Sequence, residues 1–345
     1  MKLKRFNGYL KGINFGGWLS QCVHTEEHYS SFIKEDDVKA VSDWGIDHVR
    51  VPVDYDLVEA GDGSYSEQGF SHITNAIEWC KKYGLNMILD LHKTYGYSFD
   101  DGEGETGFFY NKDYQERFYR LWEEFTKRYG KYSDMLAFEL LNEVTKKEYC
   151  DIWNEVAENC IKRIRAINKD VKILVGGYYN NSITAVPDLR MPYDENIVYN
   201  FHCYEPLIFT HQGASWIPTM DTKFRISFNS SRDAYIKACN EQLVPEQVNF
   251  PEAPKDSATV SAEYFESLFA PALKTAQERN VALYCGEYGV INLADAQDTL
   301  KWFRVINSVF AKYGIGRAAW SYKKMDFGLA DAHLDSVRTE LLKCL

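Results

Sequence analysis

The sequence predicts a (β/α)8 barrel, the TIM-barrel class of α/β folds, over residues 1–345. Short apolar runs bounded by turns alternate with longer amphipathic segments, which is the pattern of repeated βα units. Eight such runs can be counted, the number of strands in this barrel. The rival fold is a doubly wound open sheet with a GxGxxG loop after its first strand. The segment after the first apolar run, FGG at 15–17, does not match that loop.

The predicted elements follow one another with little irregularity. The strands are expected at 10–15, 46–51, 86–92, 136–142, 171–175, 197–202, 282–286 and 315–320. The helices are expected at 35–43, 67–82, 112–129, 146–168, 263–279 and 294–313. Glycines stand at 45, 84, 130 and 314, where four of these helices end, as helix C-caps prefer.

One segment, at about 205–260, lacks the βα pattern and contains five of the nine prolines. A structureless loop of that length is improbable in a compact domain. We therefore expect a small inserted subdomain after the sixth strand, on the C-terminal face where barrels bind their ligands. The alternative, a surface elaboration without a catalytic role, has equal weight.

Composition excludes several classes of partner. The formal net charge of -11 argues against nucleic acid and anionic membranes, and no apolar stretch has the length of a membrane span. The eight cysteines form no CxxC pair and are interpreted as free thiols. No signal-peptide h-region follows the basic N-terminus, so we expect either an intracellular protein or one whose leader was removed. Asn180 and Asn229 open N-x-S sequons, a pattern too common to indicate glycosylation.

Polar or aromatic residues stand at the C-terminal ends of six predicted strands. They are Arg50, His92, Asn142, Glu143, His202, Tyr204, Glu287 and Trp320. Such positions in a barrel are typical of an active site rather than of the fold. Two of them, Glu143 and Glu287, end buried strands, so both carboxylates can be directed into one pocket. A facing carboxylate pair is what glycosidic bond cleavage requires.

These eight residues, together with four longer segments, resemble glycoside hydrolase family 5, the cellulase barrels. The segments are GINFGGWLSQ at 12–21, DHVRVP at 47–52, AFELLNEV at 137–144 and YKKMDF at 322–327, and they are most similar to endoglucanases of the clostridial type. The resemblance covers nearly the whole chain. It implies a cis peptide bond after Trp320.

The resemblance also implies a role for each residue. Glu287 would be the nucleophile, held ionised by Arg50 and Tyr204. Glu143 would be the acid/base, with a pKa raised by the negative charge of Glu287.

The remaining roles concern the sugar. Asn142 would bind the sugar 2-hydroxyl. His92 and His202 would position the sugar or hold the carboxylates. Trp320 would form the floor under the sugar being cleaved.

Two further tryptophans are candidates for sugar-binding subsites. Trp18 follows two glycines after the first strand, and Trp216 lies just beyond the sixth; a core position is the alternative for Trp18. The histidines show no metal-ligand spacing, and no role requires a cofactor.

We expect a retaining endo-β-glucanase acting on β-1,4-glucan or mixed-linkage β-1,3/1,4-glucan, with a polysaccharide or oligosaccharide substrate. We also expect a monomer without a nucleic-acid or membrane partner. The alternatives are a β-mannanase, an exo-β-1,3-glucanase and, from another class, a non-catalytic carbohydrate-binding barrel.

Overall fold

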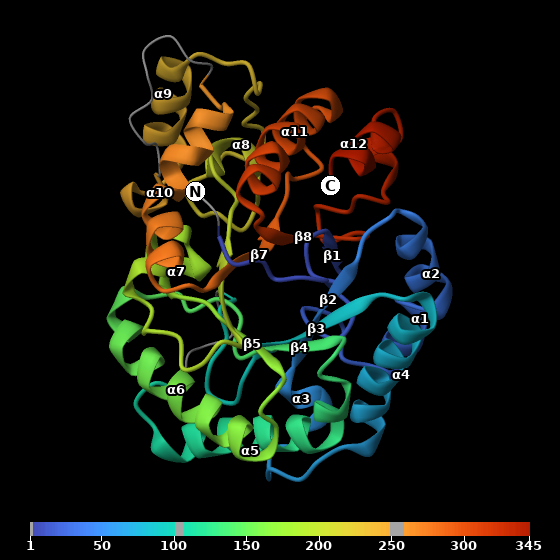
Figure 1. Ribbon diagram of the computed structural model, residues 1–345. Coiled ribbons are helices and arrows are strands. Elements are labelled where there is room, and N and C mark those ends of the chain that lie inside the picture. Colours follow the sequence, from blue (N-terminus) through green and yellow to red (C-terminus); the bar gives the residue numbers. More distant parts are fainter. Residues whose placement is uncertain (1–2, 101–106, 249–258) are drawn as a thin grey trace.

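Eight parallel strands close into a barrel in the computed structural model, which describes residues 3–100, 107–248 and 259–345. Each strand pairs with the next one in the sequence, and β1 pairs with β8 to close the ring (Figure 1). The strands are β1 (Gly12–Asn14), β2 (His48–Asp54), β3 (Asn86–Lys93), β4 (Leu136–Glu139), β5 (Lys172–Val175), β6 (Ile197–His202), β7 (Ala282–Tyr288) and β8 (Gly316–Ala319). The predicted (β/α)8 class is confirmed.

Helices surround the barrel. They are α1 (Glu26–Ser31), α2 (Glu35–Asp43), α3 (Tyr55–Val58), α4 (Glu67–Tyr83), α5 (Lys112–Tyr129), α6 (Cys150–Ile167), α7 (Tyr178–Asn181), α8 (Leu207–Thr210), α9 (Arg232–Gln242), α10 (Ala262–Glu278), α11 (Ala296–Tyr313) and α12 (Arg338–Cys344). Short 3-10 turns are η1 (Gly130–Tyr132), η2 (Lys147–Tyr149), η3 (Ile183–Asp188), η4 (Pro245–Gln247) and η5 (Ala332–Leu334). The fifth unit is irregular, because α7 and η3 stand where a long helix would lie.

Most predicted elements agree with the structure to within a few residues. Ladder pairing in β4 stops at Glu139, three residues short of the predicted end. Gly84 and Gly314 cap their helices in the left-handed conformation, as expected. Gly130 does not, because the chain continues from α5 into the 3-10 turn η1 at a φ of -57°.

Alternation along the strands separates an apolar exterior from a polar interior. In β2, Val49, Val51 and Val53 belong to the large core between strands and helices. The intervening Arg50 points into the barrel and is fully buried there. The strands therefore bury apolar side chains under the helices, and the side chains at the alternate positions point into the barrel interior.

The bottom of the barrel is closed by a separate apolar cluster. Phe6 and Tyr9 stack at a centroid distance of 4.1 Å, and Phe6 contacts the edge of Tyr284 from β7. Ile88 and Leu174 belong to the same cluster. The N-terminal segment thus fills one end of the barrel, so polar chemistry is confined to the other end.

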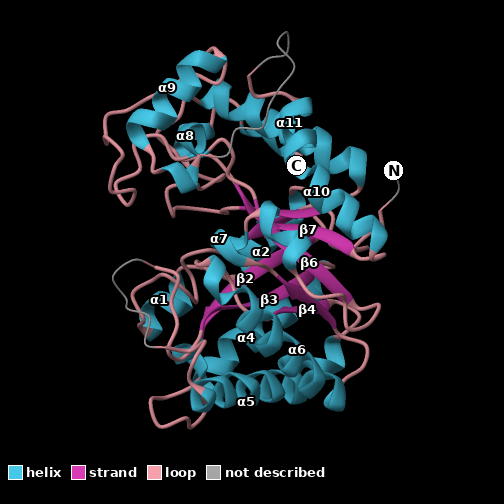
Figure 2. Ribbon diagram, turned by 90° about the vertical axis from the view of Figure 1, so that its left-hand side faces the viewer, coloured by secondary structure: helices cyan, strands magenta, loops and turns pink. Residues whose placement is uncertain are grey.

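The predicted insert begins at the C-terminal end of β6. Figure 2 shows α8 and α9 on the side of the barrel away from the N-terminus. Phe209 and Tyr235 from this segment are buried in the large core, and Trp302 of α11 donates to the carbonyl of Glu205. Residues 249–258 of the predicted insert lie outside the described residues.

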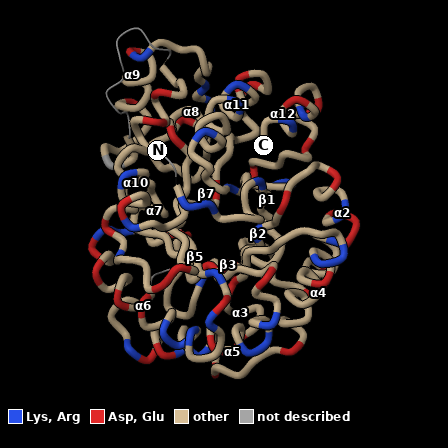
Figure 3. Tube along the Cα trace, in the orientation of Figure 1, with Lys and Arg blue, Asp and Glu red and all other residues tan. Residues whose placement is uncertain are grey.

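The surface carries both signs of charge. Lys and Arg alternate with Asp and Glu over the helices, including α5 and α6 (Figure 3). No described helix combines the length and apolar character needed to cross a bilayer.

Candidate active site

Arg50 is the centre of the polar network inside the barrel. Its Nε and Nη2 donate to both oxygens of Glu139, at 2.7 and 2.8 Å. Its Nη1 donates to Oε1 of Glu287 at 2.8 Å, and Nη2 lies 3.0 Å from Oδ2 of Asp90. The guanidinium is completely buried. A planar fork of donors can satisfy several carboxylates at once, so Arg50 connects β2, β3, β4 and β7 in one site.

Three buried carboxyl groups around one guanidinium carry an excess of negative charge if all are ionised. Burial raises the pKa of Asp90 to about 7, although Arg50 acts in the opposite direction. Burial also raises the pKa of Glu139 above its usual range. Protonation of one of these carboxyl groups relieves the excess at a low cost, because neutral carboxyls are less penalised by burial.

A β-bulge in β7 directs Glu287 into this network. The register between β6 and β7 shifts after Phe201 pairs with Cys285, so that His202 pairs with Glu287. A bulge reverses the side that the following side chain faces. Gly286 occupies the extra position, where a Cβ would lie 2.8 Å from Oδ1 of Asn200 and 3.0 Å from Nε2 of His202. Only glycine allows this close approach.

The carboxylate of Glu287 has a second donor on its other oxygen. Tyr204 donates through its hydroxyl to Oε2 at 2.9 Å, while Arg50 holds Oε1. The two donors hold both oxygens of the carboxylate and so fix its orientation.

Glu143 lies across the pocket and has neutral partners. Nδ1 of His202 lies 2.7 Å from Oε1, and Nδ2 of Asn180 donates to Oε2 at 2.8 Å. Burial raises the pKa of Glu143 to about 7, against the hydrogen bond from Asn180. Burial, not repulsion from Glu287, is the main cause, which corrects the reason expected from the sequence. Burial also lowers the pKa of His202 to about 4, so the imidazole is neutral near pH 7.

The two glutamates face each other closely. One carboxylate oxygen of each, together with a ring nitrogen of His202, lies within 4.8 Å of the others. His202 Nδ1 is 3.7 Å from Oε2 of Glu287.

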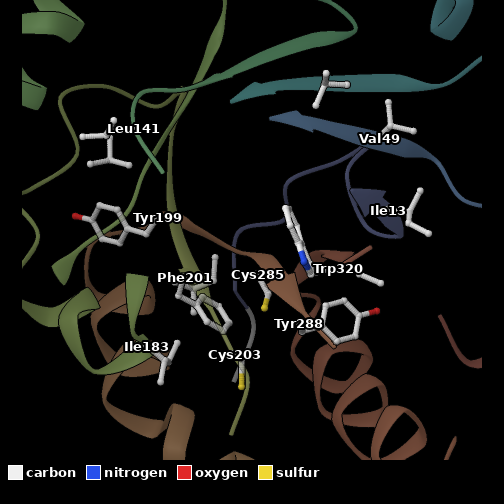
Figure 4. Packing of buried hydrophobic residues seen from close by; sticks show 14 of the residues in the cluster. Ile13, Val49, Leu141, Ile183, Tyr199, Phe201, Cys203, Cys285, Tyr288 and Trp320 are labelled. Atoms are coloured by element: carbon white, nitrogen blue, oxygen red, sulfur yellow. The ribbon is translucent and has the colours of Figure 1, made fainter. Parts of the chain in front are cut away.

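The rings of Trp320 and His92 stack beside the Arg50 network. Their rings are parallel to within 3° at a centroid distance of 5.9 Å. Nδ1 of His92 lies 2.6 Å from Oδ2 of Asp90. Figure 4 shows the indole of Trp320 near Cys285 and Tyr288 of β7. The peptide bond between Trp320 and Ser321 is cis, as the family resemblance implies.

In the side-chain amide of Asn142, the oxygen has a hydrogen-bond partner and the nitrogen does not. Its Oδ1 accepts from Arg50 at 2.8 Å. Its Nδ2 is buried and has no hydrogen-bond partner among the described residues. A buried donor without a partner is costly, so Nδ2 is available for an acceptor on a ligand.

The structure separates the two predicted subsite tryptophans. Trp18 is 1% exposed, donates through Nε1 to the carbonyl of Tyr29 and stacks on Trp79, so the subsite expected for it is wrong. Two glycines before a tryptophan do not reveal which side its ring faces. Trp216 is 46% exposed and lies at the end of a row of rings that includes Phe327.

Sequence reasoning missed several members of the site. Glu139 and Asp90 lie inside strands, Asn14 and Asn200 hold Arg50 and Glu139, and Asn180 follows β5. A charged residue inside an apolar run, as in AFELL at 137–141, is the signal that could have identified Glu139.

Two groups of described side chains have the donors and spacing to hold a metal ion. One is Glu143, His202 and Glu287 themselves; the other is His24, Asp54 and Asp56 at the end of β2. In the first group, both glutamates already accept hydrogen bonds from protein donors.

A (β/α)8 barrel with two facing glutamates, one shortly after β4 and one near the end of β7, defines a glycoside hydrolase. Comparison with known proteins agrees, because residues 10–326 match the model of the cellulase family, glycosyl hydrolase family 5. The chain belongs to this family.

Two relatives cover most of the chain. Cellodextrinase A of Ruminococcus flavefaciens is 50% identical over 310 residues, or 90% of this chain and 84% of that protein. Endoglucanase C of Acetivibrio thermocellus is 36% identical over 339 residues, or 97% of each chain. The family predicted from the sequence is confirmed. The crystal structure of endoglucanase Cel5A from Thermotoga maritima shares the fold, with a TM-score of 0.76 and 24% identity over 98% of this chain and 97% of that one.

Proposed function

We propose that this protein hydrolyses β-1,4-glucosidic bonds in soluble cello-oligosaccharides and mixed-linkage glucan, with retention of configuration. The observation that carries the proposal is the pair of carboxylates, Glu143 and Glu287, with oxygens within 4.8 Å. Retaining glycosidases have carboxyl groups about 5–5.5 Å apart, whereas inverting ones leave room for a water at about 6.5–9.5 Å. The relative named cellodextrinase, at 50% identity, supports short β-1,4-linked chains as substrates.

In the first step, an oxygen of Glu287 attacks the anomeric carbon and the bond to the leaving oxygen breaks. The proton on Glu143 moves to that leaving oxygen. Glu287 suits the nucleophile role because Arg50 and Tyr204 each donate to one of its oxygens and orient the carboxylate. Glu143 suits the acid role because burial keeps its proton up to about pH 7.

In the second step, Glu143 takes a proton from water, and the water oxygen attacks the anomeric carbon. The ester bond to Glu287 breaks and its carboxylate is released. Esterification removes the negative charge of Glu287 and leaves Arg50 without one of its counter-ions. Glu143, which lies near Arg50, then ionises more readily and can act as a base.

Substrate contacts follow from the free groups of the pocket. The unpaired Nδ2 of Asn142 would donate to the 2-hydroxyl of the sugar at the cleavage point, a contact that strengthens in the transition state. Trp320 would support the apolar face of this sugar, and Trp216 would serve a more distant subsite.

A substrate panel tests the proposal. Purified protein is assayed on cellotetraose, barley β-glucan, laminarin and mannan, with Glu287→Gln as the control for contaminating activity. Turnover of the first two substrates is expected. Preference for mannan or laminarin would replace the proposed specificity by that of a mannanase or a β-1,3-glucanase. Binding without turnover would indicate a non-catalytic barrel.

A further inference from the structure

The short turn α7, which follows β5, has an unusual backbone. Tyr179, Asn180 and Asn181 have φ values of 51°, 57° and 55°, three successive residues in the left-handed region. Asparagine tolerates this region better than most residues, because its short side chain can bond locally. The amide N–H of Asn180 donates to the carbonyl of Val144 at 3.0 Å. The turn is therefore fixed directly beside Glu143.

Two consecutive side chains of this turn reach the acid/base machinery. Nδ2 of Asn180 donates to Oε2 of Glu143 at 2.8 Å. Nδ2 of Asn181 lies 3.4 Å from Nε2 of His202. If Nε2 accepts this proton, Nδ1 of His202 carries the hydrogen and donates to Oε1 of Glu143, 2.7 Å away. Each oxygen of Glu143 thus has one donor that depends on the turn.

We propose that Asn180 is a positioning residue that orients Glu143 and stabilises its ionised form. The inference rests on the proposed function, in which Glu143 alternates between acid and base. Asn180 is exposed, and it reaches Glu143 from the turn that follows β5, the strand next to β4. It lies outside the Arg50 network, so it can change the behaviour of the acid/base without disturbing the nucleophile.

The direction of the effect follows from the groups that face Glu143. These are His202 from β6, Tyr204 after β6, Glu287 from β7, Arg50 from β2, Asp90 from β3 and Asp100 after β3. Arg50 and the hydrogen bond from Asn180 favour the ionised form of Glu143, whereas burial and the charge of Asp100 oppose it. Loss of the Asn180 donor therefore raises the pKa of Glu143 above about 7. Glu143 must be protonated for bond cleavage, so the alkaline limb of activity moves to higher pH.

Three variants test this. Asn180→Gly removes the side chain at a positive φ that glycine accepts, and Asn180→Asp keeps the shape and the turn but replaces the donor with a carboxylate. Asn229→Ala is the matched control, because Asn229 is also an exposed asparagine of an N-x-S segment and, within the described part of the chain, its side chain makes no hydrogen bond to the site. Circular dichroism and thermal unfolding verify that each variant is folded.

The decisive measurement is the pKa of Glu143, obtained by NMR titration of ¹³C-labelled glutamate carboxyls and assigned with Glu143→Gln. In Asn180→Gly it is expected to rise by about one pH unit, since one hydrogen bond to a charged group is lost, and in Asn180→Asp it should rise further, since a second carboxylate is added beside Glu143. The Asn229→Ala value should equal that of the wild type. An unchanged pKa in the folded Asn180→Gly variant would overturn the proposal, since this substitution removes the donor without adding a charge.

Kinetics separate this inference from the proposed function. On cellotetraose, the alkaline limb of kcat/KM should move upward in the Asn180 variants. On dinitrophenyl cellobioside, whose leaving group needs no proton, kcat/KM should change little. A wild-type protein inactive on every glucan would refute the function, while the titration would still decide the role of Asn180.

Discussion

Nη1 of Arg50 lies 2.8 Å from Oε1 of Glu287, which connects β2 to β7 across the interior of the barrel. The same guanidinium binds Glu139 with two hydrogen bonds, so its orientation is fixed before it meets Glu287. A charge held in this way stabilises the carboxylate without reorganising during the reaction.

Arg50→Lys should lower kcat/KM by about 100-fold or more, because a lysine cannot bind Glu139 and Glu287 together. It should also lower the melting temperature, since a lysine ammonium satisfies fewer of the buried carboxylates than the guanidinium does. Arg317→Lys is the control, as Arg317 is buried in β8 but donates to Asn307 and to backbone carbonyls instead. It should lose stability and keep kcat. Equal kinetic losses in both variants would indicate a structural role for Arg50.

The raised pKa of Glu143 should be visible in stability. Because the folded-state pKa, about 7, exceeds its ordinary value of 4.5, folding favours the protonated group, and this stabilisation is lost as pH rises through 7. Glu143→Gln cannot ionise. Its free energy of unfolding relative to wild type should therefore increase by roughly 2–3 kcal/mol between pH 5 and pH 8. Urea unfolding at the two pH values measures this, and a constant difference would contradict the assignment.

Trp216→Ala should raise KM for cellopentaose several-fold and leave kcat on dinitrophenyl cellobioside unchanged. Trp216 is 46% exposed, beside the rings of His211 and Phe327, so its exposed surface can stack on a sugar. Tyr193→Ala, another exposed aromatic, is the control. If KM for cellopentaose stays constant, Trp216 does not bind the substrate, and its segment has no role in catalysis.

Trp18→Phe should behave in the opposite way. The variant loses the hydrogen bond to Tyr29 and part of the packing on Trp79, so about 1–3 kcal/mol of stability should be lost. KM should not change for any substrate length. Thermal unfolding measures the loss of stability, and steady-state kinetics on cellopentaose measure KM. A rise in KM without a loss of stability would mean that Trp18 contacts the substrate.

The sequence allowed the barrel and its strand ends to be predicted, because period-2 and period-3.6 patterns are local. Arg50, Glu143 and Glu287 were predictable for the same reason, since each follows or interrupts an apolar run. The β7 bulge was not, because nothing in YCGEY at 284–288 distinguishes a bulge from a regular strand. Asn180 was missed because its left-handed turn arises from contacts with the chain after β4. The cause of the raised pKa of Glu143 depends on burial, which a sequence does not contain.

The central claim is that Glu287 forms a covalent bond to the sugar while Glu143 supplies and removes the proton. Proton NMR of cellopentaose hydrolysis within the first minutes tests it most directly, because the anomer released at the new reducing end appears before mutarotation. The account predicts the β-anomer first, followed by slow appearance of the α-anomer. Initial release of the α-anomer would mean that water attacks directly, and it would contradict the roles assigned to both glutamates.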